Sequence, residues 1–179
     1  MKNVLLLIVC FISSSLCLYL TGCDNTNPAK SSADNTPQES NFNFIFKYGF
    51  SGRNTLDTFK GTFTKDMVMD PAVTIEVTLT AEEMDSIYNE MVEIDFFNYP
   101  DKFSVIVPPG QAETRVTPYS TYFFKVTYQG KTKELLWHEK MTNSDEKADK
   151  LRELIKFIRG IIESKEEYKK LPEPKSGYL

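Results

Sequence analysis

The chain has 179 residues, of which 41% are hydrophobic and 13% aromatic, a composition that indicates one folded domain, at most two, and excludes a largely disordered chain. Its 21 lysines and arginines stand against 25 aspartates and glutamates, so the formal net charge is −4. Because phosphate binding needs a basic surface, this acidic balance excludes nucleic acid as the main partner.

Residues 1–22 are predicted to form a signal peptide. Lys2 supplies a positive start, and a mostly apolar run follows over residues 4–20. An uncleaved transmembrane anchor is the alternative, because a run of about 17 residues lies near the lower limit for spanning a bilayer. The residues that directly follow the run favour cleavage.

The tetrad Leu20-Thr21-Gly22-Cys23 resembles the lipobox of bacterial lipoproteins. In that family the cysteine thiol receives a diacylglycerol, the chain is cut just before the cysteine, and the new amino group is often acylated, commonly with palmitate. The resemblance implies cleavage between Gly22 and Cys23, and a membrane partner held through lipid on Cys23. It places the remaining chain outside the cytoplasm. Asp24 implies the outer leaflet of the cytoplasmic membrane, since this residue marks retention there in bacteria with two membranes.

The other two cysteines, Cys10 and Cys17, lie inside the signal peptide. The mature domain is therefore expected to hold no disulfide and no thiolate metal site. With His138 as the only histidine, the usual zinc ligands are missing, and no glycine-rich phosphate loop is present. We expect neither a metal nor another cofactor.

Residues 23–41 are predicted to be the lipidated cysteine and a flexible tether, because the segment is rich in Asn, Ser, Thr and Pro and has no large apolar residue. Such a tether reaches roughly 20–25 Å in root-mean-square terms. The folded domain is predicted over residues 42–171. Pro172 and Pro174 end its last helix, and residues 172–179 are expected to be a loose C-terminal tail.

Alternating apolar and polar residues predict the strands of the domain. The expected strands cover residues 42–50, 56–65, 73–79, 103–107, 122–128 and 131–137. Thr80 and Glu83 form a capping box that starts a helix ending near Asp95. Ser144 is expected to cap a second, long helix, whose apolar residues step by three and four.

Hairpins joined by short turns indicate antiparallel strands, and one-sided helices need an apolar sheet face to cover. We therefore expect an α+β fold in two layers, with an antiparallel sheet of about five or six strands and two main helices packed on one face. Over residues 42–163 the domain resembles small uncharacterised α+β domains common in bacterial lipoproteins, and the resemblance implies no activity. The segments that carry it are Leu79-Thr80-Ala81-Glu82-Glu83, Ile94-Asp95-Phe96-Phe97, Tyr122-Phe123-Phe124-Lys125-Val126 and Gly130-Lys131-Thr132-Lys133.

Catalytic groups are sparse in the domain. His138 beside Glu139 could act as a general base, but no serine lies in a nucleophile elbow, so a surface histidine is the favoured interpretation. We expect no catalytic residue and no enzyme. An envelope hydrolase that uses two carboxylates, Glu139 with Asp66 or Asp95, stays open as an alternative.

The aromatic residues indicate binding. Phe123 is out of phase with its neighbours on a strand, so one sheet face should expose it, and Tyr99 and Tyr119 are further candidates for a binding surface. The leading hypothesis is a non-catalytic module of the cell envelope that binds a protein, peptide or glycan. A second alternative is an inhibitory or structural lipoprotein that inserts the rigid loop Val107–Pro118 into another protein.

Overall fold

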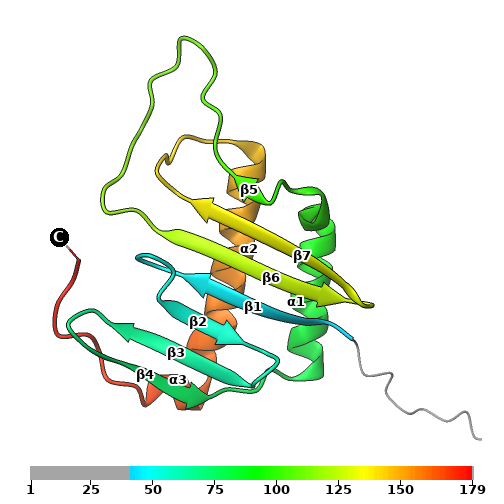
Figure 1. Cartoon of the computed structure of the whole chain (residues 1–179), viewed down its shortest axis with the longest axis vertical. Coiled ribbons are helices and arrows are strands. Elements are labelled where there is room, and N and C mark those ends of the chain that lie inside the picture. Colours follow the sequence, from blue (N-terminus) through cyan, green and yellow to red (C-terminus); the bar gives the residue numbers. More distant parts are fainter. Residues whose placement is uncertain (1–40, 179) are drawn as a thin grey trace, which may run out of the picture. The chain divides into compact units, whose positions relative to one another are not determined.

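The computed structural model describes residues 41–178, which lie in one compact unit. The predicted signal peptide, Gly22, Cys23 and almost all of the tether fall outside these residues. Seven strands form one sheet in the order β4-β3-β2-β1-β6-β7-β5 (Figure 1). The strands are β1 (Asn43–Tyr48), β2 (Asn54–Asp57), β3 (Thr62–Met67), β4 (Asp70–Glu76), β5 (Lys102–Phe103), β6 (Thr121–Tyr128) and β7 (Lys131–His138).

The α+β class is confirmed, but the expected strand number and the purely antiparallel sheet are wrong. The two-residue strand β5 runs parallel to β7, while all other neighbours are antiparallel. The chain enters β5 from the helix layer rather than through a hairpin, and such a crossover allows parallel pairing.

The additional strand arises where one long strand was expected over residues 56–65. The Asp57 carboxylate accepts hydrogen bonds from the backbone amides of Phe59 and Lys60, at 3.1 and 3.2 Å, which folds the chain into a turn. Gly61 completes this turn with a φ of 62°, a value that glycine adopts without strain. The segment is therefore divided into β2 and β3.

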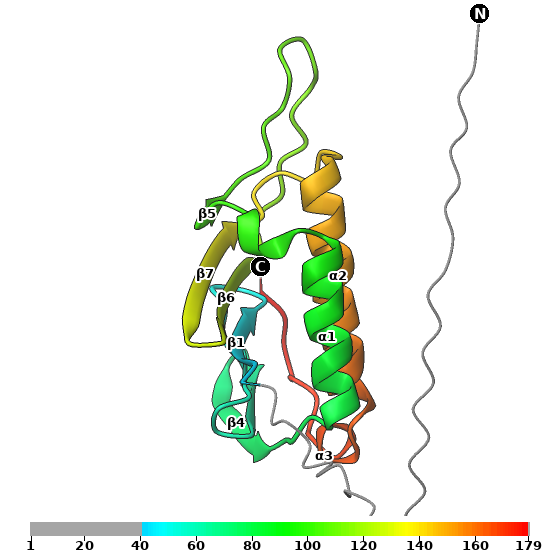
Figure 2. The same cartoon turned by 90° about the vertical axis from the view of Figure 1, so that its right-hand side faces the viewer.

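The helices form a second layer beside the sheet (Figure 2). They are α1 (Ala81–Glu93), the 3₁₀ helix η1 (Phe96–Asn98), α2 (Glu146–Ser164) and α3 (Glu166–Lys169). The capping box of α1 is confirmed, because Thr80 accepts from the amide of Glu83 and Glu83 accepts from the amide of Thr80. Helix α3 contacts β4, so the helix layer contains more than the two main helices that were expected.

Helix α2 is capped by Asp145, not by Ser144 as predicted. The Asp145 carboxylate accepts from the backbone amide of Ala148 at 2.9 Å. The Ser144 hydroxyl instead donates to the Asp149 carboxylate at 2.6 Å. Both residue types can cap a helix, and their order in the chain did not distinguish them.

The hydrophobic core fills the space between the two layers. Strand alternation turns every second side chain of β1, β3 and β6 towards the helices. The fully buried side chains include Phe44, Phe46, Leu56, Phe63, Phe124, Leu135 and Trp137 from the sheet and Ile87, Met91, Leu151, Leu154, Ile158 and Ile162 from the helices. This core is rich in stacked and edge-on aromatic pairs.

The C-terminal tail, defined here as residues 172–178, is docked, where a loose segment was expected. It follows α3 and runs along the edge of the molecule where sheet and helices meet (Figures 1 and 2). Lys65 donates a hydrogen bond to the carbonyl of Pro172, and the ring of Tyr178 stacks on Phe50 with centroids 4.1 Å apart. None of the helices within residues 41–178 is both long and apolar enough to cross a membrane.

Candidate functional site

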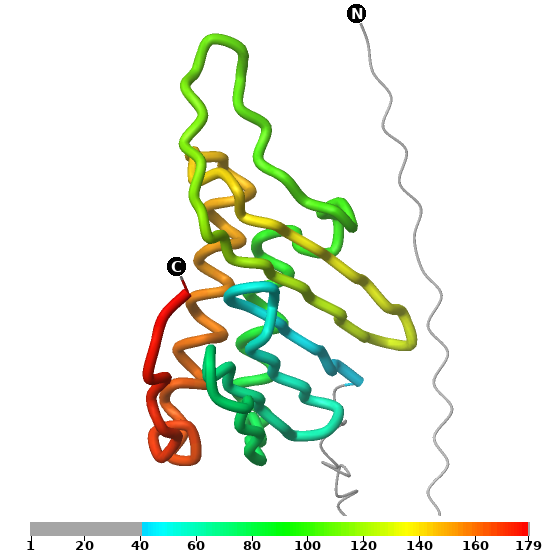
Figure 3. Tube along the Cα trace, turned by 60° about the vertical axis from the view of Figure 1, so that its left-hand side comes forward, coloured from blue at the N-terminus to red at the C-terminus, as the bar shows by residue number. Residues whose placement is uncertain are grey.

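The most prominent feature of the domain is a long projecting segment between β5 and β6, which we call the arm (residues 104–120). It extends beyond the end of the sheet that lies away from α3 (Figures 1 and 3). The arm contains neither a helix nor a strand of its own. Connections longer than about 12–15 residues without secondary structure are uncommon in compact domains and often functional.

The outgoing branch of the arm is anchored near its base. Val105 is buried against the core, while the neighbouring Ile106 is 79% exposed. A tight turn at the tip follows, in which the amide of Gln111 donates to the carbonyl of Pro108 at 3.1 Å. The tip sequence Pro108-Pro109-Gly110 is exposed. Apolar and proline residues are thus presented to solvent at the far end of the domain.

The returning branch is fixed by the chain that links β7 to α2, which we call the connector (residues 139–145). Asn143 binds the arm twice: its side-chain amide donates to the carbonyl of Ala112, and its side-chain oxygen accepts from the amide of Thr114, each at 2.8 Å. Backbone bonds from Thr142 to Thr114 and from Val116 to Lys140 continue this pairing. The arm therefore has a defined conformation.

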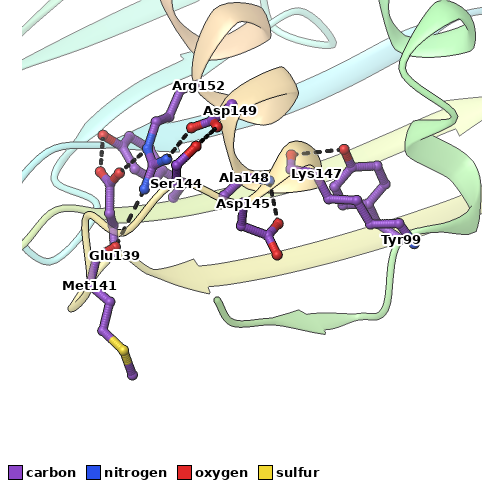
Figure 4. Close-up of polar contacts among 10 residues, drawn as sticks. Tyr99, Glu139, Met141, Ser144, Asp145, Lys147, Ala148, Asp149 and Arg152 are labelled. Atoms are coloured by element: carbon purple, nitrogen blue, oxygen red, sulfur yellow. Dashed lines mark hydrogen bonds and ion pairs between the residues drawn. The ribbon is translucent and has the colours of Figure 1, made fainter. Parts of the chain in front are cut away.

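The connector is itself held by Arg152 of α2 (Figure 4). The guanidinium donates to Glu139 at 2.7 Å, to Asp149 at 2.6 Å and to the carbonyl of Met141 at 3.4 Å. Arg152 also lies over the ring of Trp137, 5.3 Å from its centroid. One side chain thus joins the helix layer, the end of the sheet and the segment that carries the arm.

The contacts of Arg152 and Asp149 favour the charged forms of these two residues. Burial alone would lower the pKa of Arg152, but its bonds to Glu139 and Asp149 outweigh that effect and raise it. The hydrogen bond from Ser144, together with Arg152, lowers the pKa of Asp149. Burial raises the pKa of Tyr122, whose hydroxyl donates to Glu139 at 3.1 Å. Arg152 and Asp149 therefore stay charged across the neutral pH range, and Arg152 holds the connector through the carbonyl of Met141.

A pocket of about 410 Å³ lies at the base of the arm. Tyr119 forms one wall, edge-on to the exposed ring of His138 with centroids 6.0 Å apart. Lys140 lies over Tyr119, 5.3 Å from its centroid, and the Thr121 hydroxyl is hydrogen-bonded to His138 Nδ1 at 3.0 Å. The other lining residues are Phe50, Ser51, Thr117 and Pro118. No carboxylate lines this pocket, which suits an apolar or aromatic side chain of a partner.

The three aromatic residues expected on a binding surface have different positions in the structure. Tyr119 lies at the base of the arm, as just described. Phe123 lies half-buried on the sheet face opposite the helices, which is the face that its alternation with Phe124 predicts. Tyr99 does not face solvent, and its assignment to the surface was wrong. It is 3% exposed, because its ring packs between Phe96 and Phe103 and its hydroxyl donates to the carbonyl of Lys147.

Buried Tyr99 leads to an alkaline sensitivity of the fold. Burial, with the nearby charge of Asp145, raises the pKa of Tyr99 to about 12. Its stabilising contribution is complete below its unfolded pKa of about 10 and is lost as the pH rises from there to about 12. We expect the unfolding free energy to fall between pH 8 and 11 by on the order of 1 kcal/mol more in the wild type than in Tyr99→Phe. Urea unfolding followed by circular dichroism at both pH values measures this difference, and an equal fall in the two proteins contradicts it.

The candidate acid and base residues are not brought together. Glu139 is bound to Arg152 and Tyr122, and His138 is bound to Thr121. Asp66 lies on β3, four strands from β7, which corresponds to about 19 Å at the usual strand spacing. Asp95 lies between α1 and η1 and accepts a hydrogen bond from the side chain of Asn98 at 2.7 Å. Within residues 41–178 no group of three or more His, Cys, Asp or Glu side chains could hold a metal ion.

No protein-family model matches the chain, no curated protein matches its sequence, and no solved structure matches it. The function of the site therefore has to follow from its own geometry.

The residues that shape the arm, Asn143 and Arg152, were not among the sequence-based candidates. Asn143 stands directly before a predicted helix start, and Arg152 lies in a charged helix, where neither type of residue is unusual.

Proposed function

We propose that this protein is a non-catalytic interaction module, held by lipid on the outer side of the cytoplasmic membrane, that docks an envelope protein through its arm. The observation that supports this most strongly is a long connection without secondary structure that is nevertheless tied down by Asn143 and by backbone bonds to the connector. An arm that is ordered before binding loses little conformational entropy when a partner docks.

The exposed side chains of the arm support a protein partner. Ile106 lies 79% exposed on the outgoing branch, and the turn at the tip is built from two prolines and a glycine. The aromatic pocket with Tyr119 adjoins the returning branch. An apolar side chain beside an aromatic pocket is a common way in which protein interfaces gain binding energy.

Membrane anchoring agrees with this role. The lipobox-like tetrad before the domain supplies the lipid, and the segment up to residue 41 separates the domain from the headgroups. An inhibitory lipoprotein, which inserts the arm into the active site of an enzyme, is a narrower form of the same proposal. The rigidity of the arm favours it, and the nature of the captured partner distinguishes the two.

Site-specific photo-crosslinking in intact cells tests the proposal. A photoreactive residue is placed at Ile106, and in a matched control at Met69, which is 82% exposed in the turn before β4. Because the two sites are equally accessible and both apolar, we expect at least about tenfold more of a single crosslinked protein from Ile106. Equal yields at the two positions contradict the proposal.

A second variant tests whether the fixed conformation of the arm contributes to docking. Asn143→Ala removes both side-chain bonds to the arm and leaves the Arg152 network in place. We expect the yield of the Ile106 crosslink to fall severalfold, since a loosened arm must be ordered again on binding. An unchanged yield shows that the tied conformation is irrelevant to docking.

A further inference from the structure

The C-terminal tail covers a cleft at the edge of the domain that is separate from the arm. The tail cleft is the docking surface of the tail on the domain, and with the tail in place a space of about 290 Å³ remains between them. Its inner walls come from the ends of β1 and β3 and from α2 and α3, with Tyr48, Lys65, Arg159 and Tyr168 among the lining residues. The outer wall is formed by Glu173, Pro174 and Tyr178 of the tail itself.

Lys65 is the residue of the cleft that requires a partner. The alternation of β3 turns its side chain inward, between Phe63 and Met67, and it is only 6% exposed. Removing an ammonium group from water is costly unless hydrogen bonds and an opposite charge compensate. Lys65 Nζ donates to the carbonyl of Pro172 and to the Glu173 carboxylate, each at 3.1 Å. Within residues 41–178, the tail supplies all its hydrogen-bond acceptors.

The other cation of the cleft is already neutralised within the fold. Arg159 pairs with Glu163 one helical turn further along α2, at 3.0 Å, and lies over the ring of Tyr48. Asp66 also lines the cleft, and its carboxylate accepts from the amide of Val68 and from the Tyr178 hydroxyl of the tail. The cation of the cleft that pairs with no carboxylate outside the tail, within residues 41–178, is therefore Lys65. The ring of Tyr168 lies 5.1 Å from Lys65 Nζ, which favours a cation but cannot replace an anion.

The tail is attached weakly compared with the core. No residue of the tail is fully buried, and the Glu173 side chain is 83% exposed. Its second ion pair, between Lys175 and Asp70, lies in solvent and adds little. The firmest contact is Tyr178, which stacks on Phe50, accepts from Arg53 at 2.9 Å and donates to Asp66. A short segment with so few buried contacts can open without unfolding the domain.

We propose that the tail cleft is a binding site for an acidic peptide segment of another protein, which the C-terminal tail occupies until that segment displaces it. The ligand chemistry follows from the present occupant. Lys65 donates hydrogen bonds to a carboxylate and to an adjacent backbone carbonyl. Phe50 and Arg53 bind an aromatic side chain further along the same segment. A peptide with these two groups matches the cleft without any change to the fold.

The test uses the full-length protein in detergent and a fluorescent peptide with the sequence of residues 171–179 as the probe. In the wild type the attached tail competes at an effective concentration of the order of millimolar, so the probe binds poorly. In the double variant Glu173→Gln with Tyr178→Ala the tail is weakened. We expect this variant to bind the probe at least about tenfold more tightly than the wild type.

Three comparisons locate the binding. Adding Lys65→Met to the double variant should abolish the gain, and a probe with glutamine in place of its glutamate should bind at least about tenfold more weakly. Lys175→Ala in the wild type is the matched control, since it removes an exposed tail contact and should leave probe binding unchanged.

The proposal is overturned if the double variant, folded by circular dichroism, binds the probe no more tightly than the wild type. It is also overturned if the glutamine probe binds as well as the original, a result that does not depend on how Lys65→Met folds. Crosslinking at Ile106 is measured separately in the same variants. The crosslink yield tests whether the arm docks a partner, and the affinity for the peptide probe tests whether the tail cleft binds an acidic segment.

Discussion

Replacing Phe124 by alanine is expected to lower the free energy of unfolding by about 3–5 kcal/mol. Phe124 is fully buried on β6, near the middle of the sheet. Its ring stacks on Phe46 with centroids 4.7 Å apart and meets Phe96 edge-on at 5.2 Å, so one side chain links the sheet to the segment after α1. Truncation leaves a cavity among rigid aromatic rings that cannot close it.

The neighbouring residue on the same strand provides the control. Phe123 has the same chemistry but points to the opposite face of the sheet, where it is half-buried beside Lys47. Phe123→Ala should cost no more than about 1 kcal/mol. Urea unfolding followed by circular dichroism compares the two variants, provided that the dependence of the unfolding free energy on urea concentration is the same in both. Equal losses in the two variants would show that the core does not lie on the Phe124 face.

The same contrast shows what the sequence could predict. Period-two alternation placed Phe124 and Phe123 on opposite faces, and the Thr80–Glu83 capping box placed the start of α1, because both patterns act between near neighbours. The turn at Asp57–Gly61 was missed, although Leu56 and Phe63, both buried, are seven positions apart and would lie on opposite faces of one continuous strand. This change of phase, together with Asp57 and Gly61, was the local signal of a turn that divides the segment.

Other errors concern contacts between residues far apart in the chain. Tyr99 was named as a candidate for a binding surface because it lies in an aromatic-rich connection, yet its hydroxyl reaches the carbonyl of Lys147 at the start of α2. The C-terminal tail was expected to be loose because it contains prolines. Its partner Lys65 precedes it by more than 100 residues. No local pattern encodes such a pairing, since it depends on which edge of the sheet α2 and α3 come to cover.

The candidate site was predicted in part. The loop Val107–Pro118 was recognised from its prolines, glycine and polar residues, and the structure extends it to residues 104–120. Its fixed conformation could not be predicted, because that depends on two hydrogen bonds from Asn143 and on Arg152 behind the connector. Side chains of these types are mostly solvated on a surface, and only the fold distinguishes the ones that hold a loop.

Exchange of Cys23 for alanine is expected to abolish the incorporation of labelled palmitate entirely. The resemblance of the tetrad to a lipobox predicts that this thiol accepts the diacylglycerol, and no other cysteine follows it in the sequence. A single acyl chain binds a membrane only marginally, with an association constant of about 10⁴ M⁻¹, so stable anchoring needs the two or three chains that a lipidated cysteine carries. Without them, the arm would not be held near a membrane partner.

Cys17→Ala is the matched control, because this cysteine lies in the predicted signal peptide and should leave incorporation unchanged. The intact mass distinguishes the two kinds of anchor. A lipoprotein begins at Cys23 and carries the mass of its acyl groups, whereas a transmembrane anchor retains residues 1–22 without modification. The arm and the tail cleft are two separate features that are both proposed to bind other proteins outside the cytoplasm. Their location there depends on the lipid anchor, so the mass of an uncleaved, unlipidated chain would contradict lipid anchoring for both proposals.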